Sequence, residues 1–292
     1  MKAQLKSICF AVNKVETCEI LKNSDMSYNS ENAFAIVASW PELKREKVLN
    51  FCSSVYKLIE NAAILEPLVP VLEKKFKDLK ISVGNDKDAQ FTVRMSPVIP
   101  SFSRKVEVIK PAITFANSYD GKLLAQATGG LVRYTVDSKG NVSEMYTSYL
   151  KDLSFSYTFK HSNENIYSME GISATIDEYV ANFHNVEKQI EMLKRVTIKS
   201  VRNADLEKLI RRLTTGTVFP LKEIDGAITR VLYEAEIFGT NPNLWNVYNS
   251  LNYILENSES QLTNKMRIDA DTKIYANVCE FFAPKVKKKV TA

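Results

Sequence analysis

The feature that most constrains the fold is a change in the spacing of apolar residues along the chain. Between residues 81 and 159, β-branched and aromatic residues alternate with polar ones, which is the period of β-strands. After Gly171 the apolar residues recur every three or four positions, which predicts a helix of about six turns. The residues of this stripe are Ile172, Ile176, Tyr179, Phe183, Val186, Ile190 and Leu193. A sheet followed by helices predicts an α+β fold with a central antiparallel sheet at about 81–160.

One hairpin of this sheet is defined by its own residues. The segments LVRYTV at 131–136 and VSEMYTSYL at 142–150 flank a turn in which Gly140 supplies a positive φ. Alternation places Val132 and Tyr134 on one face of the first strand and Arg133 on the other. We expect prolines at strand ends or edges, because proline donates no ladder hydrogen bond. The prolines concerned are Pro97, Pro100 and Pro111.

Helices are also predicted outside the sheet. Pro41 opens a helix at 41–63, with Val48, Cys52, Val55 and Ile59 on one face and Pro67 and Pro70 beyond its end, and a short helix follows at 71–79. Behind the long helix we expect helices at 203–214, 221–238, 243–257 and 270–282. The expected organisation is a helical segment at 1–80 packed on the core, a sheet-and-helix domain at 81–283 and a basic tail at 284–292.

The composition favours a folded protein of a reducing compartment. The chain is 45% hydrophobic and 25% charged, which argues against extended disorder. Its four cysteines show no CxxC spacing and are expected to be reduced thiols. There is no apolar run near the roughly 20 residues that span a bilayer, and no signal peptide. We therefore expect a cytoplasmic location and no membrane association. In the phage or plasmid context described below, this is the cytoplasm of a bacterial host.

The sequence contains none of the common catalytic patterns. The two histidines, His161 and His184, have no second histidine or cysteine at metal-ligand spacing. Glycine-rich phosphate loops, GxSxG and HExxH are absent. We expect no metal, no small-molecule cofactor and no intrinsic catalysis. The alternative is a metal-dependent hydrolase that uses Asp120 and nearby carboxylates.

Basic and aromatic residues are the candidates for a binding surface. Cations gather after the long helix and in the tail, and phosphate contact or a solvated surface would each explain them. On the strand LSFSYTFKH, three aromatic side chains either stack on unpaired bases or pack into the core. The predicted nucleic-acid contacts are Arg133, Lys194, Arg195, Lys199, Arg202, Lys208, Arg211, Arg212, Lys287, Lys288 and Lys289, and the stacking candidates are Phe155, Tyr157 and Phe159.

Four short motifs resemble, in order and spacing, those of an uncharacterised phage and plasmid family known only as a domain of unknown function. They are NSYDG at 117–121, VR at 132–133, KHS at 160–162 and LWNVYN at 244–249. The matching residues are Asn117, Ser118, Asp120, Gly121, Arg133, His161, Ser162, Trp245 and Asn249. The chain departs from the family at Tyr119, where a histidine is usual, and at 134–137. The NSYDG segment is also a good turn sequence.

The resemblance implies a phage or plasmid context with no activity established for the family. Together with the basic segments it leads to the hypothesis of a single-stranded DNA-binding or annealing protein, or another accessory of replication or recombination. We expect a homo-oligomer. The alternative is a phage structural or protein-interaction factor with no nucleic-acid role, whose basic residues are only surface.

Overall fold

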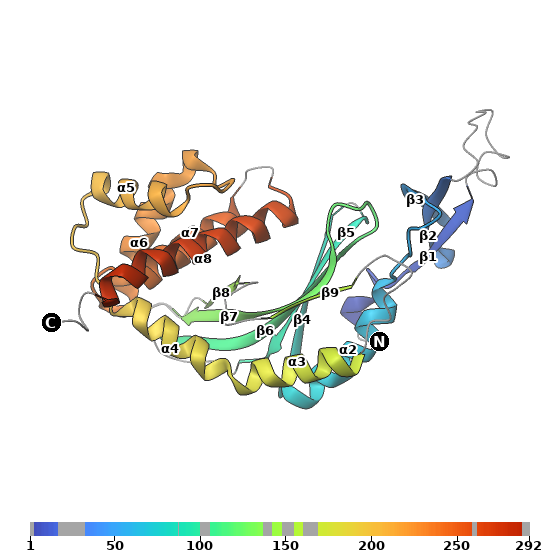
Figure 1. Cartoon of the computed structure of the whole chain (residues 1–292), viewed down its shortest axis with the longest axis horizontal. Coiled ribbons are helices and arrows are strands. Elements are labelled where there is room, and N and C mark those ends of the chain that lie inside the picture. The colour runs from blue at the N-terminus through green and yellow to red at the C-terminus, as the bar shows by residue number, and fades with distance from the viewer. Residues whose placement is uncertain are drawn as a thin grey trace. The chain divides into compact units, whose positions relative to one another are not determined.

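The computed structural model describes residues 3–16, 33–86, 88–99, 106–136, 142–147, 155–159, 169–258 and 262–287. It confirms the α+β class, with antiparallel sheets followed by a C-terminal set of helices (Figure 1). The chain forms two compact units, each assembled from separate stretches. The first unit contains residues 1–98, 114–127 and 156–177, and the second contains 99–113, 128–155 and 178–292. The predicted boundaries at residues 80 and 283 stay predictions.

The larger sheet has six strands, five of them in the order β4-β5-β6-β7-β8, with β9 also paired to β7. Their bounds are Leu79–Asp86, Gln90–Pro97, Val106–Ser118, Ala125–Val136, Val142–Thr147 and Ser156–Phe159. The β7–β8 hairpin is confirmed, with Val136 opposite Val142, and its turn lies outside the described residues. Pro97 ends β5 as predicted. Pro111 lies inside the 13-residue strand β6, so the prediction is wrong there: a long strand keeps most of its ladder when one donor is missing.

The helix predicted at 41–63 is wrong, because residues 45–53 form a strand and a helix begins only at Asn61. Strands β1 (Ala11–Glu16), β2 (Ala33–Trp40) and β3 (Arg45–Ser53) form a three-stranded antiparallel sheet in that order. Cys52 lies opposite Phe34 and Val48 opposite Val37, so both belong to a strand, whereas Val55 lies in the turn after it. Val48 and Val55 are 40% and 68% exposed and form no buried helical stripe. Strand pairing with β2 therefore overrides the helix-like spacing.

Helix α2 (Asn61–Lys75) runs through Pro67 and Pro70, which were expected to follow a helix end. It replaces the short helix predicted at 71–79, whose last residue begins β4. Each proline in a helix interior costs about 3 kcal/mol or more, whereas each fully buried aliphatic side chain contributes about 1.5–3 kcal/mol. Tertiary burial therefore outweighs the prolines. The buried apolar side chains are Ile64, Leu65, Leu68, Val69 and Leu72.

The helical stripe at 172–193 is confirmed, since all seven of its residues are buried. It is divided between two helices, α3 (Met169–Ala181) and α4 (Phe183–Lys194), because Asn182 leaves helical geometry with φ −92° and ψ 6°. The C-terminal helices are α5 (Asn203–Leu213), α6 (Ile224–Phe238), α7 (Leu244–Asn257) and α8 (Asn264–Lys287). Within the second unit α7 contacts α4, α6, α8 and β8, and is buried on nearly all sides. None of the described helices is long and apolar enough to cross a bilayer.

Candidate functional site

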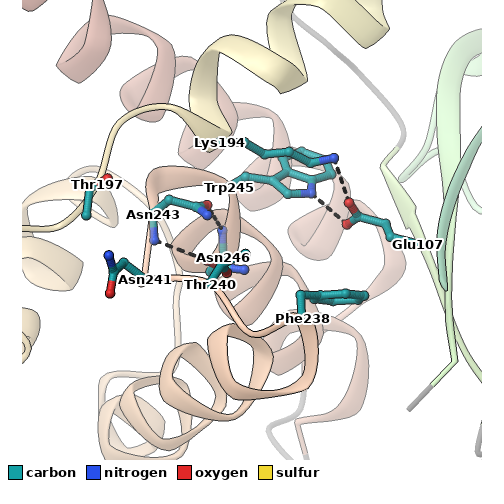
Figure 2. A pocket seen from close by; sticks show the side chains of 9 residues that line it. All are labelled: Glu107, Lys194, Thr197, Phe238, Thr240, Asn241, Asn243, Trp245 and Asn246. Carbon is teal, nitrogen blue, oxygen red and sulfur yellow. Dashed lines mark hydrogen bonds and ion pairs between the residues drawn. The ribbon is translucent and has the colours of Figure 1, made fainter. Parts of the chain in front are cut away.

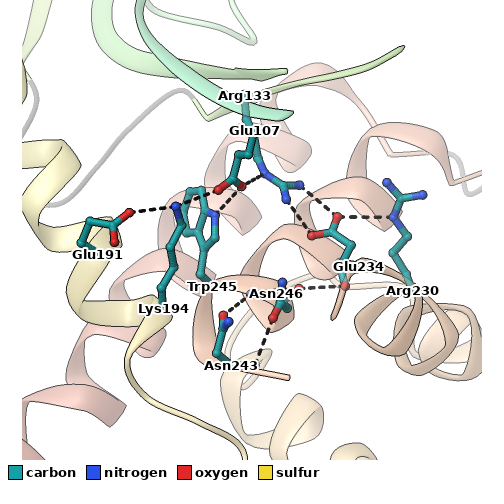
Figure 3. Close-up of polar contacts among 10 residues, drawn as sticks. Glu107, Arg133, Glu191, Lys194, Arg230, Glu234, Asn243, Trp245 and Asn246 are labelled. Carbon is teal, nitrogen blue, oxygen red and sulfur yellow. Dashed lines mark hydrogen bonds and ion pairs between the residues drawn. The ribbon is translucent and has the colours of Figure 1, made fainter. Parts of the chain in front are cut away.

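Strand β7 is buried on both faces within the second unit, so its charged residue Arg133 is buried as well. Val132 and Tyr134 pack with Ala112 and Tyr146 on one face. Arg133, between them in sequence, points to the opposite face, where α6 and α7 contribute Glu234 and Trp245 (Figure 3). The alternation predicted for this strand is therefore present, but its polar-looking face is covered by helices.

Arg133 is 1% exposed and fully paired. Its two terminal nitrogens bind the two oxygens of Glu234 at 3.0 and 2.9 Å, and its Nε–H donates to Glu107 Oε1. Its guanidinium carbon also lies 5.9 Å from the ring centre of Trp245. A planar guanidinium matches a carboxylate in this two-point geometry, which compensates for the loss of water around both charges.

Glu107 connects three elements of the second unit. Its Oε1 accepts from Trp245 Nε1 at 2.8 Å, and its Oε2 lies 2.8 Å from Lys194 Nζ, which also pairs with Glu191 at 2.8 Å. Burial raises the pKa of Glu107, but the charges of Arg133 and Lys194 and the hydrogen bonds outweigh it and lower the pKa to about 2. The carboxylate is therefore ionised at neutral pH.

A pocket of about 410 Å³ opens beside this cluster (Figure 2). The connection between α6 and α7 frames it: Gly239 ends α6 with a left-handed φ of 63°, and Asn243 begins α7. Asn243 and Asn246 form a capping box in which each side-chain oxygen accepts the other residue's backbone N–H, at 3.0 and 3.1 Å. The lining residues are Glu107, Lys194, Thr197, Phe238, Thr240, Asn241, Asn243, Trp245 and Asn246.

The predicted basic contacts divide into buried, paired and unpaired residues. Burial excludes Arg133 from contact with DNA, which corrects that prediction, and Lys194 is held by Glu107 and Glu191. Arg202 pairs with Asp205 and Arg211 with Glu207, both on the surface. The exposed cations with no ion pair to a described residue are Arg195, Lys199, Lys208 and Arg212. Lys288, Lys289 and the side chain of Lys287 lie outside the described residues.

A second pocket, of about 450 Å³, lies where α5 ends near α8. Two cations line it, Arg212 and Lys273, together with Glu280. The Arg212 guanidinium lies 5.1 Å from the centre of the Phe281 ring, which holds the side chain in place. Lys273, a residue that the sequence did not single out, therefore lines the same pocket as Arg212.

The aromatic side chains at 155–159 pack against other parts of the protein and do not form an exposed surface for base stacking. Phe159 is 1% exposed and packs edge-on against Phe115 in the first unit, so burial excludes it as a base-stacking residue. Phe155 is half-buried in the second unit, where its ring packs over Gly129 and against Tyr179. Tyr157 is half-buried and packs on Phe159. The core interpretation of these aromatics is the one that fits their contacts.

The NSYDG segment is a structural turn in the first unit. Tyr119 is fully buried, and its hydroxyl accepts from the backbone N–H of Asn61, the first residue of α2, at 3.0 Å. Asn117 Nδ2 donates to Ile59 O and Asn61 Oδ1 at 3.0 and 2.9 Å. Further on, Asp120 Oδ1 accepts from the Lys122 N–H, and Gly121 has a φ of 73°. The motif therefore anchors the start of α2.

Replacing Asn117 with alanine is expected to lower the free energy of unfolding by about 1–3 kcal/mol, because buried polar groups of Ile59 and Asn61 lose their partner. Chemical denaturation measures the effect. The matched control is Asn185→Ala on the exposed side of α4, expected to change stability by less than about 0.5 kcal/mol. An equally small effect at Asn117 would contradict the anchoring role.

The other motif residues that the structure describes are held by different parts of the fold. Trp245 anchors α7 through Glu107, and Asn249 is buried with a side-chain nitrogen that meets no acceptor among the described residues. His184 is exposed, whereas His161 and Ser162 lie outside the described residues. Both carboxylate oxygens of Asp120 accept hydrogen bonds, one from the Lys122 N–H in its own turn and one from Gln90 Nε2 at 2.9 Å. Over the described ranges, no three His, Cys, Asp or Glu side chains gather as metal ligands.

Sequence reasoning missed the two acids that organise the cluster, Glu107 and Glu234. Glu234 carried a usable signal, because it lies three residues after Val231 on the apolar stripe of α6, where an isolated charge requires a buried partner. Glu107 carried none beyond its position on a strand. No family model matches this chain, and no curated protein matches it significantly. The resemblance to the phage and plasmid family therefore stays a prediction.

Proposed function

We propose that this protein binds single-stranded DNA, without intrinsic catalysis, as an accessory of phage or plasmid recombination or replication. The observation that carries the proposal is the set of four exposed cations at the end of α4, in the connection that follows it and on α5, namely Arg195, Lys199, Lys208 and Arg212. No described acid lies within ion-pair distance of them, although Lys208 is attracted to the nearby Asp205, so their charges are available to phosphate groups.

The distribution of charge supports this choice of surface. Seven lysines and arginines lie between residues 194 and 212, and only Asp205 and Glu207 oppose them. The resulting excess of five equals the formal net charge of +5 of the whole chain. We define residues 194–212 as the basic segment; its excess of positive charge attracts a polyanion, although Lys194 is already paired with Glu107 and Glu191.

The test is the salt dependence of binding to a labelled oligothymidylate, measured by fluorescence anisotropy. Binding releases counterions, and for single strands each phosphate contact contributes about 0.7 to the slope of log K against log salt. The double variant Lys199→Gln/Lys208→Gln is expected to weaken binding and to lower this slope by about 1.4, which corresponds to two lost contacts.

The matched control is Lys74→Gln/Lys77→Gln, which removes the same charge from two exposed positions of the first unit. Lys74 lies in the last turn of α2, and Lys77 lies just beyond its end. It is expected to leave the slope unchanged. Absence of binding at micromolar protein and low salt would end the proposal. If both double variants lost the same amount of DNA affinity, the basic segment would contribute only through the overall charge of the protein and not as a specific contact surface.

A protein-interaction role is the second candidate, and the edge of the three-stranded sheet favours it. Large apolar side chains on and beside β3 are exposed, with Leu43 at 65%, Phe51 at 63% and Val55 at 68%. β3 is the last strand of its sheet, and such an edge can pair with a strand of a second copy. Light scattering with and without oligonucleotide separates the two candidate functions. The protein-interaction role is favoured if the protein forms oligomers, if Phe51→Lys abolishes them, and if DNA does not change their size.

A further inference from the structure

The pocket between Glu107 and the α6–α7 connection is joined to the basic segment by backbone hydrogen bonds. Ile198 N–H donates to Pro242 O at 2.8 Å, and Leu244 N–H donates to Val196 O at 3.0 Å. Residues 196–198, between Arg195 and Lys199, therefore lie directly against the chain that frames the pocket. If Arg195 and Lys199 hold a DNA strand, as proposed above, the backbone between them places that strand close to the pocket.

The electrostatics of the pocket disfavour a phosphate group. The cations nearest to it, Lys194 and Arg133, are already neutralised by Glu107, Glu191 and Glu234. An additional anion would face the ionised carboxylate of Glu107, and the cation that lines the pocket, Lys194, is already paired. The pocket therefore fits a ligand without charge.

The remaining lining groups fit a flat ring that carries both donors and acceptors. The capping box uses the side-chain oxygens of Asn243 and Asn246, and neither Nδ2 group donates to a described residue, so both can donate to a ligand. Glu107 has about four acceptor positions, of which Arg133, Trp245 and Lys194 use three. Phe238, half-buried at the end of α6, supplies an aromatic surface (Figure 2).

We propose that this pocket takes one unstacked nucleobase of the strand bound by the basic segment. The volume of about 410 Å³ falls within the range of about 300–1,000 Å³ that is usual for small-ligand pockets. The base lies against Phe238, its acceptors receive the Nδ2 groups of Asn243 and Asn246, and its amino group, where it has one, donates to Glu107. The proposal rests on the proposed function, because the basic segment delivers the strand.

The experiment compares an oligothymidylate with an abasic oligodeoxynucleotide of the same length, which keeps the phosphates and lacks the bases. The wild-type protein is expected to prefer the base-carrying strand. Phe238→Leu is expected to weaken its binding about 5- to 150-fold, the usual effect of losing one stacked base, and to leave binding of the abasic strand unchanged. The matched control Tyr233→Leu removes a 40% exposed aromatic from the same helix outside the pocket, and is expected to keep the preference.

A second variant guards against a folding effect. Asn241→Leu changes an exposed residue at the pocket, removes an amide and narrows the opening, and is expected to reduce the preference for bases as Phe238→Leu does. Equal binding of both strands by the wild-type protein, or equal weakening of both strands by Phe238→Leu, would overturn the base pocket and leave DNA binding intact. Failure to bind either strand would overturn the proposed function, and the pocket proposal with it.

Discussion

Replacing Arg133 with methionine is expected to lower the free energy of unfolding by about 3–5 kcal/mol. Methionine fills a similar volume, but it removes the partner that binds both oxygens of Glu234, which is 1% exposed, and leaves only the longer ion pair with Arg230 at 3.4 Å. A buried carboxylate without compensation is more costly than the same site without any charge. Because domains are stable by about 5–15 kcal/mol, this single change removes a large part of the total. Urea denaturation followed by circular dichroism measures it.

Two further variants separate the charge effect from the loss of a long side chain. Arg211→Met breaks the surface pair with Glu207, where both side chains are about half exposed, and is expected to cost less than about 1 kcal/mol. The double variant Arg133→Met/Glu234→Leu removes both charges and is expected to recover part of the loss, because the most buried carboxylate is gone and Glu107 keeps its ion pair with Lys194. A loss below about 1 kcal/mol for Arg133→Met, or no recovery in the double variant, would contradict the proposed role of this pair.

The second large effect is a loss of stability in acid that depends on Glu107. Its pKa is lowered from the ordinary value of 4.5 to about 2, so the folded state favours the ionised form. The stabilisation is fully present above about pH 4.5 and is lost as the pH falls toward 2. A difference of this size corresponds to about 3 kcal/mol at neutral pH. Chemical denaturation at a series of pH values measures it.

The variant Glu107→Gln tests the assignment to this residue. We expect it to be about 3 kcal/mol less stable than the wild type at pH 7, and the difference to shrink steadily between pH 4.5 and 2, because the wild-type carboxyl becomes protonated there. Glu187→Gln, at an exposed position of α4, is expected to follow the wild-type pH profile. A Glu107→Gln curve parallel to the wild type from pH 7 to 2 would show that another group causes the acid sensitivity.

The sequence was most informative where one local pattern agreed with the final packing. The stripe from Ile172 to Leu193 and the alternation around Val132 both lie where they were expected, because burial follows helix and strand periodicity directly. The exposed cations of the basic segment could likewise be identified in advance, since charged side chains on a helix end are normally solvated. The sequence therefore predicted these four cations, but it could not separate them from Arg133, which is buried, or from Lys194, which is paired.

Tertiary structure decided what no local pattern specifies. The spacing of Val48 and Val55 suits a helix, yet pairing with β2 makes that region a strand, and strand pairing depends on residues distant in the sequence. Arg133 has the sequence context of an exposed strand residue, and only the helices placed over β7 bury it beside Glu234, 101 residues away. The sequence by itself determined the fold class and the basic surface, while the charged cluster and its pocket exist only because distant segments bury complementary charges together.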